Sequence, residues 1–196
     1  MLTAVLFDLD NTLIDRDRAV RECVCDQFSN PAVCAELLVL DEGGYGDRQK
    51  LFATWQEYAG TPIDQQSFGR LIAERIQPDR ELLNALHSLS KLFKLGIITN
   101  GGSENQRGKF CAAGLSEVIP NECLWVSAEL GMTKPDPRLF LFASRALNEP
   151  PEHCLYIGDH QNDLAGAKSA GMRARIVDGV LDASRVNAII ASEHLQ

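Results

Sequence analysis

Short apolar runs recur along the chain, and each of them is followed by polar residues. Runs of this length, rich in Val, Ile, Leu and Phe and without polar alternation, are typical of parallel strands that are buried on both faces. Helix-length amphipathic segments separate them. The pattern therefore predicts an α/β fold with a doubly wound parallel sheet. The runs are Thr3–Phe7, Leu95–Thr99, Leu124–Ser127, Cys154–Ile157 and Ala174–Val177.

Helices are expected to begin soon after these strands. Their starts are placed near Ser103, at Pro135–Asp136, at residues 160–162 and at residues 181–183. Proline is well suited to a first helical turn because its missing N–H has no partner there anyway. We therefore expect Pro135 to lie inside the first turn of its helix.

The stretch from residue 14 to residue 78 departs from this alternation, because it has helical periodicity and no convincing strand. Glycine- and proline-containing breaks divide it. We expect an inserted α-helical domain at 14–78 within a core formed by 1–13 and 79–196. The expected helices of the insertion are 17–28, 32–40, 48–59 and 66–76, and a further helix at 79–92 leads back to the sheet.

Composition narrows the class of protein. The chain has 196 residues, 45% of them apolar, and a formal net charge of −8 with its basic residues scattered. A negative surface of this kind repels phosphate backbones and anionic membranes, so neither nucleic acid nor membrane is expected as a partner. The sequence shows no secretory signal and no apolar run of membrane-spanning length, so we expect a cytoplasmic protein. The six cysteines form no C-x-x-C pair and are interpreted as reduced, mostly buried residues.

Two carboxylates follow the first strand, in the motif Asp8-Leu9-Asp10-Asn11-Thr12. Ligands of open α/β sheets bind outside the carboxyl ends of the strands, so these acids stand where chemistry is expected. Turns also favour Asp and Asn, and the motif alone is consistent with an ordinary turn.

A second polar turn, Thr99-Asn100-Gly101-Gly102, lies directly between a strand and a helix. It offers a hydroxyl and free backbone N–H groups, which suit a phosphate at a helix start. Lys134 is a third candidate, although lysines are usually solvated surface residues.

Two more acids, Asp159 and Asp163, follow the strand that ends at residue 157. With Asp8 and Asp10 they would meet at one edge of the sheet, where so many carboxylates cannot all ionise cheaply without a cation. Oxygen ligands favour Mg²⁺, and an anion site beside a cation site is what phosphoryl transfer requires. We therefore expect Mg²⁺ as cofactor.

These four motifs, in this order and at strand ends, resemble those of phosphatases of the haloacid dehalogenase superfamily. The resemblance implies a Rossmann-like core and Mg²⁺-dependent hydrolysis of a small phosphomonoester, such as a sugar phosphate or a nucleotide. It implies Asp8 as nucleophile and Asp10 as general acid and base, with both also binding metal, Asp10 through its carbonyl. Thr99 and Asn100 would bind phosphate together with Lys134. Asp159 would be a metal ligand, and Asp163 would act in the second shell. The helical insertion is similar to that family's cap domain.

Other functions stay open at this point. A phosphomutase would use the same aspartyl-phosphate but return the phosphoryl group to a sugar, and a regulatory protein would bind metal or phosphate without turnover. A dehalogenase is less favoured, because the leaving group of a phosphate ester needs an acid such as Asp10 and a halide does not. The sequence leaves the substrate and the oligomeric state open.

Side chains of the insertion are assigned structural roles. Phe52, Trp55 and Tyr58, spaced i, i+3 and i+6, are interpreted as the core of the insertion or a partly exposed seam. The arginines near its entrance, Arg16, Arg18 and Arg21, are interpreted as solvated residues of a helix face. For His160 we expect a surface or second-shell position, because a helix start disfavours an imidazolium.

Overall fold

The computed structural model describes residues 1–194 of the chain. It divides into two compact units, one made of Met1–Ile14 together with the segment from Gln77 onward, and the other made of Asp15–Ile76. Each unit is described separately below.

The first unit is built on a parallel five-stranded sheet with the strand order β3-β2-β1-β4-β5. The central strand β1 pairs with β2 on one side and β4 on the other, with Phe7 opposite both Ile97 and Ile157. All four residues of β1 are buried, as expected for a strand covered on both faces. The doubly wound parallel sheet expected from the sequence is confirmed. The strands are β1 (Ala4–Phe7), β2 (Lys94–Thr99), β3 (Leu124–Val126), β4 (Cys154–Gly158) and β5 (Arg173–Ile176).

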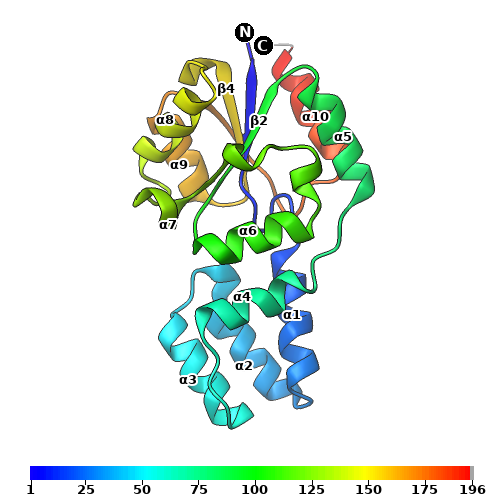
Figure 1. Cartoon of the computed structure of the whole chain (residues 1–196), viewed down its shortest axis with the longest axis vertical. Coiled ribbons are helices and arrows are strands. Elements are labelled where there is room, and N and C mark those ends of the chain that lie inside the picture. Colours follow the sequence, from blue (N-terminus) through cyan, green and yellow to red (C-terminus); the bar gives the residue numbers. More distant parts are fainter. Residues whose placement is uncertain (195–196) are drawn as a thin grey trace. The chain divides into compact units, whose positions relative to one another are not determined.

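Helices cover both faces of this sheet (Figure 1). Helices α5 and α10 lie beside each other on one face, while α8 and α9 cover the other. The helices of this unit are α5 (Arg80–Ser90), α6 (Ser103–Ala112), α7 (Ser127–Leu130), α8 (Pro137–Ala146), α9 (Gln161–Ser169) and α10 (Ala183–His194).

The core under α8 and α9 is tightly packed. The ring of Tyr156 in β4 meets that of Phe140 in α8 edge to face, with centroids 4.9 Å apart. Gly96 of β2 leaves room for Trp125, because a Cβ at that position would lie 2.5 Å from the indole ring. Such interdigitation fixes the strands and therefore the positions of the residues that follow them.

The second unit is helical, as the periodicity of its sequence predicts. Its core holds a group of aromatic rings in which Trp55 contacts both Phe28 and Phe68, and Phe52 contacts Phe68. Tyr58 is 45% exposed and donates to Glu36, so the aromatic series is part core and part surface, as expected. The helices are α1 (Arg16–Gln27), α2 (Pro31–Asp41), α3 (Arg48–Ala59) and α4 (Gln65–Ala73).

One arginine of this unit contradicts the expectation of a solvated helix face. Arg16 is only 4% exposed, and its guanidinium donates to both oxygens of Asp41 at 2.6 and 2.7 Å. Arg48 donates to Asp41 as well. Burial alone would raise the pKa of Asp41, but the two guanidinium groups lower it below its ordinary value. The interpretation was wrong because the partner lies 25 residues away, where helical periodicity carries no information about it.

The expected start of α8 was also wrong. Pro135 lies before the helix, in a cis peptide with Lys134, and Asp136 caps the helix by accepting from the N–H of Arg138. Pro137 takes the first helical position instead. The preference for proline at that position holds, but it applies to the next proline along the chain.

The structure bears on the expectations about membrane-spanning helices and about the cysteines. Within residues 1–194, no helix is long and apolar enough to cross a membrane. All six cysteines are free thiols; Cys23, Cys34 and Cys154 are buried, whereas Cys25 and Cys111 are exposed. The cysteines are therefore unpaired as expected, but only half of them are buried.

Candidate active site

Polar residues collect at the carboxyl edge of the sheet. Asp8 directly follows β1, Asn100 follows β2 and Asp159 follows β4, while Ser127 follows β3. Because the strands are parallel and in register, these residues emerge at one edge of the sheet.

Lys134 is the central cation of this edge. Its ammonium group lies 2.7 Å from Asp8 Oδ1 and 2.6 Å from Asp163 Oδ1, and it donates to the hydroxyl of Tyr156. The residue is only 6% exposed, so it is not a solvated surface lysine. A buried ammonium with three oxygen partners is held rigidly, and it brings the first and fourth motifs together.

Burial and neighbouring charges determine the protonation of Asp8 and Lys134. Burial raises the pKa of Asp8 to about 7; Lys134 opposes that rise, while Asp163 adds to it. Burial alone would lower the pKa of Lys134, but the carboxylates of Asp8 and Asp163 raise it above its ordinary value. The site therefore carries a permanent positive charge beside a carboxylate that is costly to ionise without further cations.

Three carboxylates of this edge are close enough to share a metal ion. One oxygen from each of Asp8, Asp159 and Asp163 lies within 4.8 Å of the others. Burial raises the pKa of Asp159, and the neighbouring Asp163 raises it further, so the carboxylate form of Asp159 is disfavoured here. An all-oxygen donor set of this kind fits a hard divalent cation such as Mg²⁺ or Ca²⁺.

Asp163 owes its position to the start of α9. It accepts from the backbone N–H of His160, while Asn162 N–H donates to the imidazole of His160, so the two residues form a reciprocal cap. Gly158 permits the approach of this carboxylate, since a Cβ there would lie 2.4 Å from Asp163 Oδ2. His160 is half-buried and serves the helix cap, in keeping with the position expected for it.

The second motif is tied to Lys134 through its asparagine. The side chain of Asn100 accepts from the backbone N–H of Lys134 at 2.8 Å and donates to its carbonyl at 3.2 Å. Gly101 N–H donates to the hydroxyl of Ser127 at the end of β3. Thr99 is 1% exposed. The turn that we expect to bind phosphate is thus held from two sides.

Asp10 is not one of the three clustered carboxylates, and its side chain makes contacts that the sequence did not predict. Its side chain pairs with the ammonium of Lys109 and accepts from the amide of Gln106. Both residues come from the buried face of α6, and the amide of Gln106 also reaches the hydroxyl of Thr99. The signal in the sequence was a lysine and a glutamine at spacing i, i+3 beside the apolar Phe110, on the face that packs inward.

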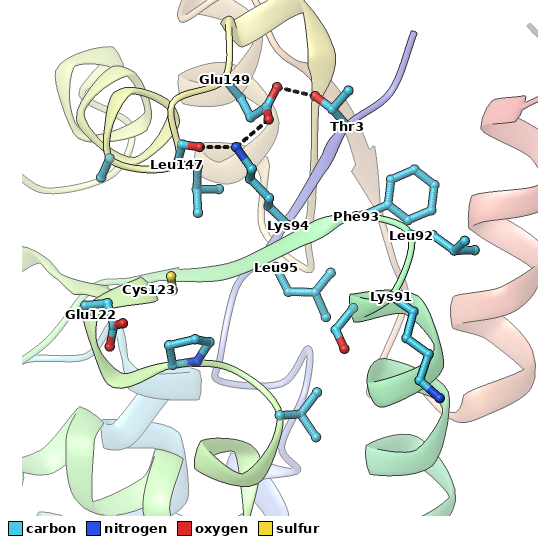
Figure 2. Close-up of a pocket in the computed structure, with 14 residues that line it drawn as sticks. Thr3, Lys91, Leu92, Phe93, Lys94, Leu95, Glu122, Cys123, Leu147 and Glu149 are labelled. Atoms are coloured by element: carbon cyan, nitrogen blue, oxygen red, sulfur yellow. Dashed lines mark hydrogen bonds and ion pairs between the residues drawn. The ribbon is translucent and has the colours of Figure 1, made fainter.

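A cavity of about 760 Å³ lies at the other end of the strands, where Thr3 precedes β1 and Lys94 begins β2 (Figure 2). Figure 2 shows the ammonium of Lys94 between the carbonyl of Leu147 and the carboxylate of Glu149, which also accepts from Thr3. Lys94 and Glu149 are thus paired with each other. This cavity shares no residue with the carboxylate cluster.

A doubly wound sheet that carries carboxylates and a buried lysine at its carboxyl edge has the layout of an α/β enzyme. The chain belongs to the haloacid dehalogenase-like hydrolases, because that family matches it over residues 2–171.

Relatives within the family include named phosphatases. A phosphoserine phosphatase from Thermus thermophilus is 42% identical over 85 residues, which are 43% of this chain and 33% of that protein. A glyceraldehyde 3-phosphate phosphatase from Methanopyrus kandleri is 26% identical over 193 residues, covering 88% of this chain and 82% of that protein. Among solved structures, the hydrolase YfnB from Bacillus subtilis, bound to magnesium, superimposes with a TM-score of 0.69 at 23% identity, covering 91% of this chain and 93% of that one. The last similarity supports the fold alone.

Proposed function

We propose that the chain is a Mg²⁺-dependent phosphatase that hydrolyses a small phosphomonoester through an aspartyl-phosphate on Asp8. The observation that carries the proposal is the contact of Lys134 with Asp8 inside a cluster of three carboxylates. An aspartyl-phosphate mechanism needs a nucleophile, a fixed cation and oxygen ligands for a metal close together, and this contact supports assigning those roles here. Relatives that match most of the chain and are named phosphatases support the same reading.

In this reaction a carboxylate attacks a phosphate dianion, and the repulsion between the two negative charges opposes the attack. Lys134 lowers this barrier because its ammonium, which contacts Asp8 and remains protonated, offsets the negative charge of the phosphoryl oxygens. The backbone N–H groups of the turn after Thr99 and the N-terminus of α6 favour the phosphoryl oxygens. Asp10 then protonates the leaving oxygen and later accepts a proton from the water that hydrolyses the acyl phosphate.

Asp8 and Asp159, with the backbone carbonyl of Asp10, would hold the metal, and Asp163 would support them, since its carboxylate converges with those of Asp8 and Asp159. When bound, a divalent cation supplies positive charge for the phosphoryl oxygens. For the chain itself, that charge offsets the burial of Asp8, whose pKa of about 7 shows that its carboxylate form is disfavoured without it.

For the substrate we propose a phosphate ester of a small metabolite, such as a sugar phosphate or a nucleotide. The relatives that match most of the chain include phosphatases named for glyceraldehyde 3-phosphate and for N-acylneuraminate 9-phosphate. The helical unit Asp15–Ile76 is proposed to act as the cap that selects the ester. Asp10 favours a phosphatase over a dehalogenase, because an alkoxide leaving group needs a proton and a halide does not.

The test is phosphate release from a panel of phosphate esters by the purified chain, with Mg²⁺ and with EDTA. We expect release with Mg²⁺, its loss in EDTA and its return when Mg²⁺ is restored. The matched control is Asp8→Asn, purified in the same way, which excludes a contaminating phosphatase. Full activity in EDTA would refute the metal requirement, and hydrolysis of no ester would refute the phosphatase.

A further inference from the structure

Helix α6 turns two polar side chains toward the interior of the sheet unit. Gln106 and Lys109 lie three residues apart, on the face that also buries Phe110, and they are only 2% and 5% exposed. Residues at this spacing are neighbours on a helix surface. A lysine and a glutamine buried side by side need partners, because burial removes the hydrogen bonds that water would give them.

The partner of Lys109 is the carboxylate of Asp10. The ammonium contacts both Asp10 oxygens, in a pair whose side chains are 6% and 20% exposed. This contact joins residues 99 positions apart in the sequence. It links the first motif to a helix that contributes no residue to any of the four motifs.

Gln106 completes the arrangement around the same carboxylate. Its amide nitrogen lies 2.9 Å from Asp10 Oδ2 and 2.7 Å from the carbonyl of Asn100, and it also reaches the hydroxyl of Thr99. Gly101 leaves space for it, since a Cβ there would approach the Gln106 side chain to 3.0 Å. Gln106 thus sets the position of Asp10 relative to the turn after β2.

Stability is a weak reason for such an arrangement. A buried ion pair recovers little more than the cost of removing both charges from water, and an apolar pair of similar volume is often as stable. What Lys109 and Gln106 provide is a fixed orientation for a carboxylate that stays partly exposed.

We propose that Lys109 and Gln106 are positioning residues that hold the Asp10 carboxylate in the orientation from which it deprotonates the hydrolytic water. The inference rests on the proposed function, in which Asp8 carries the phosphoryl group. In this step water attacks phosphorus, its proton passes to Asp10, and the bond between phosphorus and Asp8 breaks to release inorganic phosphate and the Asp8 carboxylate. Neither Lys109 nor Gln106 contacts the reacting atoms in this account.

The test uses Lys109→Met in the full chain with p-nitrophenyl phosphate and Mg²⁺. The activated ester needs little acid catalysis, so formation of the phosphoenzyme should continue while its hydrolysis slows. We expect kcat to fall on the order of 10- to 100-fold, as for a misplaced catalytic group, with KM unchanged or lower. Acid-quenched protein should show more phosphorylated Asp8 at steady state than the parent, together with a burst of p-nitrophenol. Lys91→Met, at an exposed lysine, is the matched control and should behave as the parent.

A second variant keeps the test decisive if Lys109→Met fails to fold. Gln106→Met leaves the ion pair in place and should also accumulate phosphoenzyme, with a smaller loss of kcat. Variants that fold but keep parental kcat, or lose kcat without accumulating phosphoenzyme, would overturn the positioning role. If the parent itself forms no phosphoenzyme and releases no phosphate, the proposed function fails instead.

Discussion

Asp159→Asn separates the two effects that the carboxylate cluster has on stability. The substitution removes one negative charge and one candidate metal ligand at the same time. Burial and Asp163 both raise the pKa of Asp159, so ionising it costs free energy in the metal-free protein. The metal-free variant should therefore melt at or above the metal-free parent, while its response to Mg²⁺ should be much weaker.

The size of the charge repulsion follows from the distance between the carboxylates, and the size of the Mg²⁺ stabilisation follows from the excess of Mg²⁺ over its Kd. Two carboxylate charges at 4.8 Å, the upper limit of the separations in this cluster, repel by about 3.5 kcal/mol at an effective dielectric constant of 20, and by about 1 kcal/mol in water. Asp159 is half-buried and Lys134 lies nearby, so the lower figure is the better guide. Mg²⁺ at a hundredfold excess over its Kd should stabilise the parent by about 2.7 kcal/mol. For a chain of this size that corresponds to about 5 to 10 °C in Tm. A loss on the order of 100-fold in affinity would leave about 0.4 kcal/mol, or about 1 °C.

Calorimetric melting with and without Mg²⁺ measures both effects, and the response should appear in the transition of the sheet unit. Glu152→Gln is the matched control, because it removes an exposed acid that precedes the amino end of β4. That variant should gain as much from Mg²⁺ as the parent. If Asp159→Asn responds to Mg²⁺ as strongly as the parent, then Asp159 is not a ligand and the reasoning is refuted.

Two further substitutions test the packing around the charged groups. Gly158→Ala should displace the Asp163 carboxylate, because the new Cβ would lie 2.4 Å from it, and should reduce the Mg²⁺-induced rise in Tm; an unchanged rise would contradict this placement. Arg16→Met leaves a buried Asp41 short of a partner and should destabilise the helical unit by about 3 to 5 kcal/mol, whereas Arg18→Met, at an exposed pair, should cost less than about 1 kcal/mol. The folded-state pKa of Asp41 lies below its ordinary 3.8. The difference in the free energy of unfolding between the parent and Arg16→Met should therefore be largest above about pH 4 and shrink as the pH falls through that lowered pKa. Denaturant titrations at several pH values measure it. A difference that grows on acidification would contradict the ion pair.

Much of the fold was predictable because its signals are local. The buried strands are short apolar runs whose ends coincide with the motif residue Thr99 or precede Asp8 and Asp159 by one position. Parallel order then places these ends on one edge, so the candidate site follows from strand ends without knowledge of side-chain contacts.

Long-range pairs were not predictable in this way. A lysine on a helix is interpreted as solvated until its partner is known. The partner of Lys109 is Asp10, in the first motif near the start of the chain. Arg16 was misassigned for the same reason, since its burial depends on Asp41. The start of α8 was misplaced because either Pro135 or Pro137 could occupy the first helical position. Asp136 caps the helix, so Pro137 occupies that position.

The most direct test of the account is to locate the phosphoryl group on the protein during turnover. The parent and the variants Asp8→Asn and Asp10→Asn are mixed with p-nitrophenyl phosphate and Mg²⁺, quenched in acid and digested, and the peptides are analysed by mass spectrometry. The account predicts one phosphoryl group on Asp8 in the parent, a larger fraction in Asp10→Asn because its hydrolysis is slowed, and none in Asp8→Asn. A phosphoryl group on another residue, or phosphate release by Asp8→Asn at the parental rate, would contradict it.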